Sequence, residues 1–294
     1  MTATEALWRG GAGERAAPGL YIVATPIGNL RDISLRALAT LAGVETVLAE
    51  DTRVSRTLLS QYGIATPLSA YHEHNAALVR PGIIARLQAG AALALISDAG
   101  TPLISDPGHK LVTEAIAAGV PVIPIPGATA LLAALMAAGL PADRFFFEGF
   151  LPAKAAARRA RIVELAAIPG TLVFYESPRR TAQALADLAA VLGPREAVIA
   201  RELTKHFEIF RRAALPVLAA QLAEEDTPKG EIVLLVAPPG EAAAPSGEDI
   251  DAALRAALQK FSVKDAAAIV SGQTGAPRRA LYARALELAR DAKP

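Results

Sequence analysis

The 294-residue chain contains no cysteine, which excludes disulfide bonds and thiolate metal sites and is typical of a protein of the reducing cytoplasm. No apolar run approaches the roughly 20 residues that span a bilayer, so no membrane association is expected. Charged residues interrupt the segment 1–18, and it lacks the apolar stretch of a signal peptide. We interpret it as a flexible N-terminal tail. Hydrophobic residues make up 52% and charged residues 20%, which predicts a folded globular protein with room for two domains.

Common phosphate-binding and metal-binding signatures are also missing. No G-x-G-x-x-G follows the first apolar run, which argues against a Rossmann dinucleotide site. Lys229-Gly230 is followed by Glu231, where a P-loop requires Ser or Thr. The four histidines lack a convincing metal-ligand spacing; His72 and His74 alternate as in a strand. These histidines therefore predict no metal site, and Mg²⁺ held by carboxylates is the remaining alternative.

Short apolar runs alternate with Ala/Leu-rich stretches along most of the chain. Such alternation predicts an α/β fold with mainly parallel sheets covered on both faces. Buried helices are the alternative, but Gly, Pro or Asp punctuates each short run. The predicted strands are Leu20–Ala24, Val44–Ala49, Leu93–Ser97, Val120–Ile125, Thr171–Tyr175, Ala197–Ala200 and Ile232–Val236. The clearest predicted helices are Ser34–Leu41, Leu111–Ala118, Ala128–Ala138 and Thr181–Leu192.

Breaks in this pattern predict the domain organisation. The alternation restarts after Gly139–Arg144, which places an N-terminal α/β domain at 19–140 and a second α/β domain at 141–238. The Pro/Gly/Ala-rich stretch at 239–249 reads as a linker. A helical C-terminal module over 250–294 follows, with helices predicted at Ile250–Phe261, Val263–Ser271 and Pro277–Ala289. Ser262 and Asp265 have the spacing of a capping box.

Polar turns follow most of the predicted strands. Ligands of parallel α/β sheets lie outside the carboxyl ends of the strands, where loops converge and helix N-termini face them. A single such turn is also compatible with ordinary turn chemistry. Six of them predict a cleft lined by strand ends from both halves: 25–29, 50–53, 97–108, 126–129, 175–178 and 201–204.

Eight ordered blocks of sequence resemble one known family. They are "LYIVATPIGNLRDISLRAL", "AEDTR", "LISDAGTPLISDPG", "PIPGATA", "DRFFFEGFLP", "FYESPRR", "ARELTK" and "KGEIVLLV". Together they resemble the ribosomal RNA small-subunit methyltransferase I family. That family belongs to the tetrapyrrole-methylase-like, class III methyltransferases, which use S-adenosylmethionine, and it methylates a cytidine ribose 2′-hydroxyl of 16S rRNA. The resemblance implies two α/β domains with the cofactor in the cleft between them, a helix-turn-helix-like C-terminal module, and a homodimer.

The resemblance also implies a set of cofactor-binding residues. In the first half these are Pro26, Ser97, Asp98, Thr101, Thr129 and Ala130. In the second half they are Tyr175, Glu176, Leu203 and Thr204. Many members of the superfamily have Gly-Asp-Pro where this chain has Ser97-Asp98-Ala99-Gly100-Thr101-Pro102, which fits the ribosomal branch better than the tetrapyrrole enzymes. An alternative for Asp98 is a helix cap or Asx turn.

A ribose hydroxyl is a poor nucleophile, so a carboxylate that accepts its proton would assist methyl transfer. Asp51 and Glu50, after the second predicted strand, are the candidates for this catalytic role, with Asp51 preferred. A solvated carboxylate at a helix entry is the alternative.

Cations that contact RNA phosphates are expected near the cleft and in one basic cluster. Asn29, Arg53 and Lys205 are the candidates near the cleft. Lys154, Arg158 and Arg159 belong to the acid-free stretch "LPAKAAARRAR", which a solvated helix face also explains. The C-terminal module is only mildly basic.

The sequence therefore predicts a cytoplasmic S-adenosylmethionine-dependent methyltransferase of 16S rRNA in the small ribosomal subunit. A tetrapyrrole or precorrin methyltransferase of the same fold is one alternative, and a non-catalytic RNA-binding protein is another.

Overall fold

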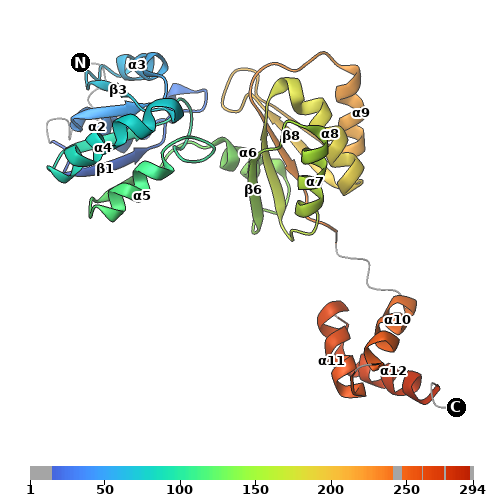
Figure 1. Cartoon of the computed structure of the whole chain (residues 1–294). Helices are drawn as coiled ribbons and strands as arrows, with labels where there is room; N and C mark the ends of the chain where they lie inside the picture. Colours follow the sequence, from blue (N-terminus) through green and yellow to red (C-terminus); the bar gives the residue numbers. More distant parts are fainter. Residues whose placement is uncertain (1–14, 241–246, 260, 275, 292–294) are drawn as a thin grey trace. The chain divides into compact units, whose positions relative to one another are not determined.

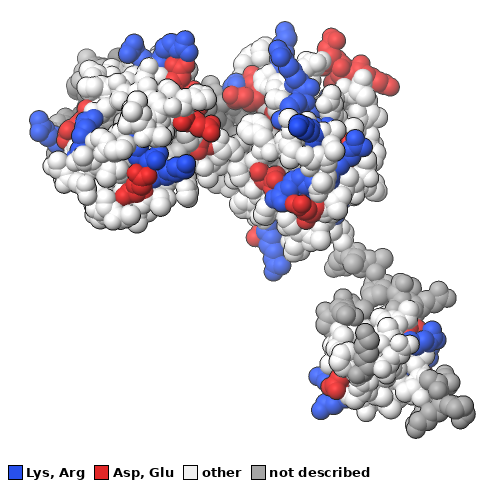
Figure 2. Space-filling model, viewed as in Figure 1, with Lys and Arg blue, Asp and Glu red and all other residues white. Residues whose placement is uncertain are grey.

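The structure is a computed structural model that describes residues 15–240, 247–259, 261–274 and 276–291 (Figure 1). Residues up to Pro238 form one compact unit and the residues from Pro239 onward form a second. Most of the tail predicted at 1–18 and of the linker predicted at 239–249 lies outside the described residues. On the face shown in Figure 2, Lys and Arg side chains occur both singly and beside Asp and Glu. No helix in the described part of the chain is long and apolar enough to cross a membrane.

The first sheet has five parallel strands in the order β3-β2-β4-β1-β5. Its helices connect successive strands, as parallel pairing requires. The strands are β1 (Gly19–Val23), β2 (Thr46–Ala49), β3 (Leu68–Ala70), β4 (Ala92–Ile96) and β5 (Val122–Ile125). The helical segments are η1 (Leu30–Asp32), α2 (Leu35–Gly43), α3 (Thr52–Gln61), α4 (Glu73–Gln88) and α5 (His109–Ala117).

Strand β4 shows why a continuous apolar run suits the centre of this sheet. Its side chains alternate between two cores: Ala94 and Ile96 pack with α2 and α3, while Leu93 and Leu95 pack with α4 and α5. Every residue of the strand is buried. A strand covered on both faces has no solvent side, so it carries no polar positions.

The second sheet also has five strands, in the order β6-β7-β10-β8-β9. Only β6 and β7 pair parallel; β10 is antiparallel to both β7 and β8, and β9 is antiparallel to β8. The expectation of mainly parallel sheets is thus confirmed for the first sheet and wrong for the second. The strands are β6 (Phe145–Phe150), β7 (Thr171–Glu176), β8 (Glu196–Arg201), β9 (Ile209–Ala214) and β10 (Ile232–Val236). The helices that follow β5 are α6 (Ala130–Ala138), α7 (Ala155–Leu165), α8 (Pro178–Leu192) and α9 (Leu215–Glu224).

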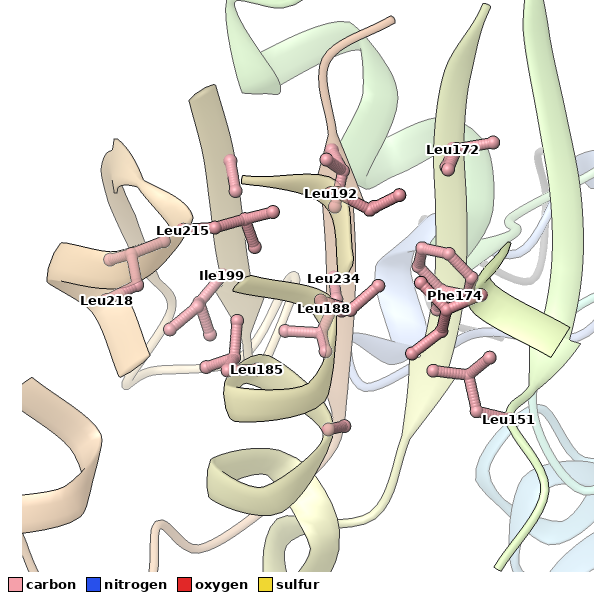
Figure 3. Close-up of a cluster of buried hydrophobic side chains, with 14 of the residues drawn as sticks. Leu151, Leu172, Phe174, Leu185, Leu188, Leu192, Ile199, Leu215, Leu218 and Leu234 are labelled. Atoms are coloured by element: carbon pink, nitrogen blue, oxygen red, sulfur yellow. The ribbon is translucent and has the colours of Figure 1, made fainter. Parts of the chain in front are cut away.

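Two different apolar layers cover the second sheet. On one face α7, α8 and α9 form a large core in which Leu185 and Leu188 of α8 reach Ile199 and Leu234 of the sheet (Figure 3). On the other face α6 packs against β7, β8 and β10. Helix α6 lies within the predicted range of the first domain, 19–140, but its packing favours a boundary before Ala130.

The C-terminal unit is a bundle of α10 (Gly247–Leu258), α11 (Val263–Thr274) and α12 (Arg278–Asp291). Leu254, Val270 and Leu281 are among the residues of its own small core. The Ser262 hydroxyl accepts a hydrogen bond from the N–H of Asp265 at 3.2 Å and donates to the Asp265 carboxylate at 2.7 Å, so these two residues interact at the start of α11 as their spacing predicts. The three predicted helices are confirmed within a few residues at each end.

Leu188→Ala tests the larger core of the second sheet. Leu188 is fully buried, so truncation leaves a cavity and is expected to lower the unfolding free energy by about 2–5 kcal/mol. Val163→Ala on α7 is the control, because Val163 is 61% exposed and its loss should change stability by about 0.5 kcal/mol or less. Urea denaturation measures both. Equal effects of the two substitutions would contradict the packing described.

Candidate active site

A cavity of about 380 Å³ lies where strand ends of the two sheets meet. Its walls come from the turns after β1, β4, β5 and β8, from the end of β7, and from the start of β10. The lining residues are Ile27, Ala99, Gly100, Thr101, Ile104, Ser105, Asp106, Thr129, Ala130, Phe150, Tyr175, Glu176, Ser177, Pro178, Leu203, Gly230, Glu231, Ile232 and Val233.

The strand directions explain this convergence. All five strands of the first sheet are parallel, so their carboxyl ends share one edge. In the second sheet Ile232 pairs with both Glu176 and Arg201, which sets the start of β10 between the ends of β7 and β8. The predicted convergence of polar turns is therefore observed for most of these turns. The contribution of Gly230 and Glu231, which precede a strand, was not predicted.

The loop after β4 is held by hydrogen bonds to neighbouring turns. The N–H of Thr25 donates to the carbonyl of Gly100 at 2.8 Å, and Gly100 returns a bond at 3.1 Å. The hydroxyl of Ser97 donates to the same Gly100 carbonyl at 3.1 Å. Thr101 donates to the carbonyl of Ala128 at 3.1 Å, which joins this loop to the segment before α6. Gly100 has a φ of +86°, a conformation that other residues rarely adopt.

The Asp51 carboxylate binds the backbone and the side chain of Arg53 at the start of α3. It caps α3 by accepting the N–H of Arg53 at 2.8 Å and pairs with the Arg53 guanidinium at 2.6 Å. Hydrogen bonding from Arg53 lowers the pKa of Asp51 to about 2, so its carboxylate is a weak base. The N–H of Asp51 donates to Asp98 at 3.0 Å, which gives Asp98 a structural role at the ends of β2 and β4. Glu50, Asp51 and Asp98 are not among the described residues that line the cavity.

Asp106 is a lining carboxylate that the sequence analysis did not single out. Burial, followed by the negative charge of Glu50, raises the pKa of Asp106 to about 6, and a hydrogen bond with Ser97 acts in the opposite direction. Burial and then Asp98 also raise the pKa of Glu50. A perturbed pKa in a cavity is a feature of functional carboxylates, which makes Asp106 a candidate site residue.

Residues at the end of β7 connect the second sheet to α6. The Tyr175 hydroxyl accepts the N–H of Leu131 at 3.1 Å, in the first turn of α6, and burial raises the pKa of this tyrosine. Glu176 is 3% exposed and accepts the N–H of Ser177 at 2.8 Å. Its second carboxylate oxygen is 3.3 Å from the guanidinium of Arg180 and makes no hydrogen bond to the described residues.

The turn after β8 is held in an uncommon backbone conformation. Glu202 and Thr204 flank the buried Leu203 with φ values of +54° and +64°, in the left-handed region. Lys205 closes the turn through ion pairs with Glu202 at 2.8 Å and Glu231 at 3.2 Å. Its stem packs against Gly28, where a Cβ would lie 2.5 Å from the Lys205 Cγ.

The predicted cofactor-binding residues divide into two groups. Thr101, Thr129, Ala130, Tyr175, Glu176 and Leu203 line the cavity. The others, Pro26, Ser97, Asp98 and Thr204, lie in the turns that build the walls and are not lining residues. The sequence held a signal for Asp106, because it lies within the polar turn predicted at 97–108 after β4.

The basic residues predicted to contact RNA have varied surroundings. Asn29 caps η1 by accepting the N–H of Arg31 at 3.1 Å, and the Arg53 side chain is 88% exposed. Lys154 directly precedes α7 and is exposed, and Arg159 lies 3.4 Å from Asp187. Arg158 is 3% exposed and pairs with Asp187 at 2.7 Å. The structure assigns Arg158 a structural role in place of the expected contact with RNA, because its charge is buried and neutralised.

Comparison with known proteins first defines the class. A family model described as Tetrapyrrole (Corrin/Porphyrin) Methylases matches residues 19–219, and one described as RsmI C-terminal HTH domain matches residues 244–289. The crystal structure of uroporphyrin-III C-methyltransferase from Thermus thermophilus, complexed with S-adenyl homocysteine, superposes with a TM-score of 0.52. It is 21% identical and the match covers 74% of this chain and 96% of that one, which shows a shared fold. The expected fold class is confirmed: this is a tetrapyrrole-methylase fold with an added helical unit.

Closer relatives then define the family. The chain is 54% identical over 272 residues to ribosomal RNA small subunit methyltransferase I of Mesorhizobium japonicum, covering 92% of each chain. It is 50% identical over 274 residues to the protein of that name from Pseudomonas aeruginosa, covering 91% of this chain and 96% of the other. The chain belongs to the ribosomal RNA small subunit methyltransferase I family.

Arg158→Ala tests the structural role of that residue. Removing Arg158 leaves the Asp187 carboxylate with only the 3.4 Å contact to the more exposed Arg159, which is expected to cost about 3 kcal/mol of unfolding free energy. Arg159→Ala is the matched control on the same helix; its side chain is 58% exposed, so a loss of about 1 kcal/mol or less is expected. Thermal and urea unfolding measure both. A stable Arg158→Ala protein with weakened RNA binding would restore the original expectation.

Proposed function

We propose that this protein transfers a methyl group from S-adenosylmethionine to the 2′-hydroxyl of a cytidine ribose in 16S rRNA of the small ribosomal subunit. Membership of the family, together with the chemistry of the cavity, carries this proposal. We further propose a cytoplasmic location, with which the absence of cysteine is compatible.

The charge of the cavity lining fits a cationic methyl donor. The described residues around the cavity include the carboxylates Asp106, Glu176 and Glu231 and no Lys or Arg. S-adenosylmethionine carries a sulfonium and an ammonium, and a carboxylate favours both. The buried Glu176 oxygen that makes no hydrogen bond within the described structure can accept one from such a group, alongside its 3.3 Å contact with Arg180. For the phosphates of a dinucleotide, the described lining supplies no Lys or Arg.

Apolar lining residues provide the remaining surface that the donor requires. Ile27, Ala130, Leu203 and Val233 form walls suited to an adenine ring. Thr101 and Thr129 supply hydroxyl groups beside them. We propose Thr101, Thr129, Ala130, Tyr175, Glu176 and Leu203 as the residues that hold the donor, with Pro26, Ser97, Asp98 and Thr204 shaping their turns.

When bound, S-adenosylmethionine supplies an already activated methyl group, so the protein has to align the ribose hydroxyl and remove its proton. Asp106 is the proposed proton acceptor, since its carboxylate lines the cavity and is ionised above about pH 6. The proton of the 2′-hydroxyl passes to a carboxylate oxygen of Asp106. Asp51, capped and paired, keeps α3 and the Asp98 turn in place.

The C-terminal unit is proposed to bind the RNA substrate. It matches the model described as a C-terminal HTH domain. Lys264, Arg278 and Arg279 are exposed on α11 and α12, and such cations bind phosphates.

The proposed homodimer agrees with the exposure of Leu132 (49%) and Met136 (83%) on α6, an apolar surface that a second copy would cover.

Methyl transfer to isolated 30S subunits tests the function directly. The full chain with radiolabelled S-adenosylmethionine is expected to place label on a cytidine ribose of 16S rRNA, with a tetrapyrrole precursor as the alternative acceptor. A chain ending at Pro238 is expected to bind S-adenosylmethionine like the full chain but to bind 30S subunits more weakly. Label on the tetrapyrrole, or donor binding without any transfer, would contradict the proposed substrate.

Asp106→Asn tests the proton acceptor. The substitution is expected to lower kcat by at least about 100-fold, with a small change in donor affinity, because general-base assistance is lost. In the unaltered enzyme kcat should fall as the pH drops through about 6, where Asp106 becomes protonated, and the variant should lack this step.

Thermal unfolding and Asp51→Asn provide the controls. The folded-state pKa of Asp106 is raised, so its ionised form destabilises the fold at pH 8 and the Asn variant should not melt earlier there. Asp51→Asn should keep the acidic limb of the pH profile. If Asp51→Asn abolishes that limb and Asp106→Asn retains it, Asp51 is the base.

A further inference from the structure

One face of helix α3 is a polar surface that the proposed active site does not use. The face consists of Arg53, Arg56, Thr57, Ser60 and Gln61, which line a shallow groove. These positions recur at intervals of three and four residues, so they share one side of the helix. The opposite side carries the buried residues Ser55, Leu58 and Leu59. We call the exposed set the α3 face.

The α3 face is rich in hydrogen-bond donors and positive charge. Helix α3 contains no acidic residue. The Arg53 side chain is 88% exposed although it pairs with the helix-capping Asp51. Arg56 is exposed and has no carboxylate partner within ion-pair distance among the residues described. In Figure 2, Lys and Arg atoms lie over the position that α3 has in Figure 1.

The α3 face begins next to the cavity. The residue before α3, Asp51, donates its N–H to Asp98, and Asp98 directly precedes the lining residues Ala99 and Gly100. The ten residues of α3 extend about 15 Å from that point, at 1.5 Å per residue. That length accommodates more than one phosphate of a nucleic-acid strand.

Helix α7 also carries basic residues, but their charges are paired with carboxylates. On α7, Arg158 and Arg159 face Asp187, and Arg161 pairs with Glu148 and Glu164 at 2.6 Å each. Their charges are neutralised within the fold. A sequence count therefore favours α7, whereas in the structure Arg56 of α3 is exposed and has no carboxylate partner among the described residues.

We propose that the α3 face binds phosphates of the RNA strand whose ribose enters the cavity. This inference rests on the proposed function and names a surface on which the substrate backbone lies. A phosphate contact fits better than a protein contact, because no hydrophobic side chain lines the groove and protein interfaces have apolar centres. Guanidinium groups beside hydroxyl and amide groups are typical phosphate contacts.

The test compares Arg56→Ala, Arg56→Lys and Arg159→Ala in the full chain. Equilibrium binding to isolated 30S subunits and to 16S rRNA transcribed in vitro is measured from 50 to 300 mM KCl. Loss of one phosphate contact is expected to reduce the slope of log K against log salt by about 0.7–0.9 and to weaken binding severalfold at low salt. Arg56→Lys should keep most of the slope, since lysine also neutralises a phosphate.

Arg159→Ala is the matched control, since it removes an exposed arginine from a helix whose charge is already paired. It should leave the slope unchanged, and none of the three variants should change the affinity for S-adenosylmethionine. An unchanged slope and affinity in Arg56→Ala would overturn the proposal. Weaker binding without a change of slope would also overturn it, since it indicates a partner without phosphates. Failure of the unaltered enzyme to methylate or bind either RNA would instead reject the proposed function.

Discussion

The packing of α6 against the second sheet is the contact on which the cavity depends. This helix is almost entirely apolar, and it covers β7, β8 and β10 together with Ile27 from the turn after β1. In its first turn the N–H of Leu131 donates a hydrogen bond to the Tyr175 hydroxyl at the end of β7. Because α6 directly follows β5 of the first sheet, burying its side chains on the second sheet brings the strand ends of both sheets to one cavity. The hydrophobic burial of α6 thus also assembles the cavity.

The cavity lining is acidic, and the basic residues near it lie outside the lining. The described lining carries the carboxylates Asp106, Glu176 and Glu231. Nearby cations form ion pairs, as Lys205 does with Glu202 and Glu231. A cationic donor and a polyanionic acceptor need these two environments side by side. Burial, followed by the negative charges of Glu50 and Asp98, raises the pKa of Asp106 to about 6.

Particular elements show how far sequence reasoning reached. The strands β1, β4, β7 and β10 were predicted almost to the residue, because buried strands read as short continuous apolar runs. Strands β3, β6 and β9 were not among the predicted strands; β3 has three residues, β6 contains a bulge at Gly149, and β9 carries two arginines. The expected parallel direction of β10 was wrong, because an apolar run looks the same for a parallel and an antiparallel strand. Arg158 was read as a surface cation because its partner Asp187 lies 29 residues away.

The sequence by itself determined the family, the α/β alternation, the separate helical unit and the six polar turns. Each of these follows from local residue patterns or from motifs in a fixed order. Tertiary structure decided which of those residues work together. It placed Glu231 and Gly230 opposite the end of β7. It also paired Asp51 with Arg53, brought Asp106 to the cavity lining, and set acidic partners beside the arginines of α7. Ionisation and availability of a charge depend on burial and on partners distant in sequence, and those are set only when the chain has folded.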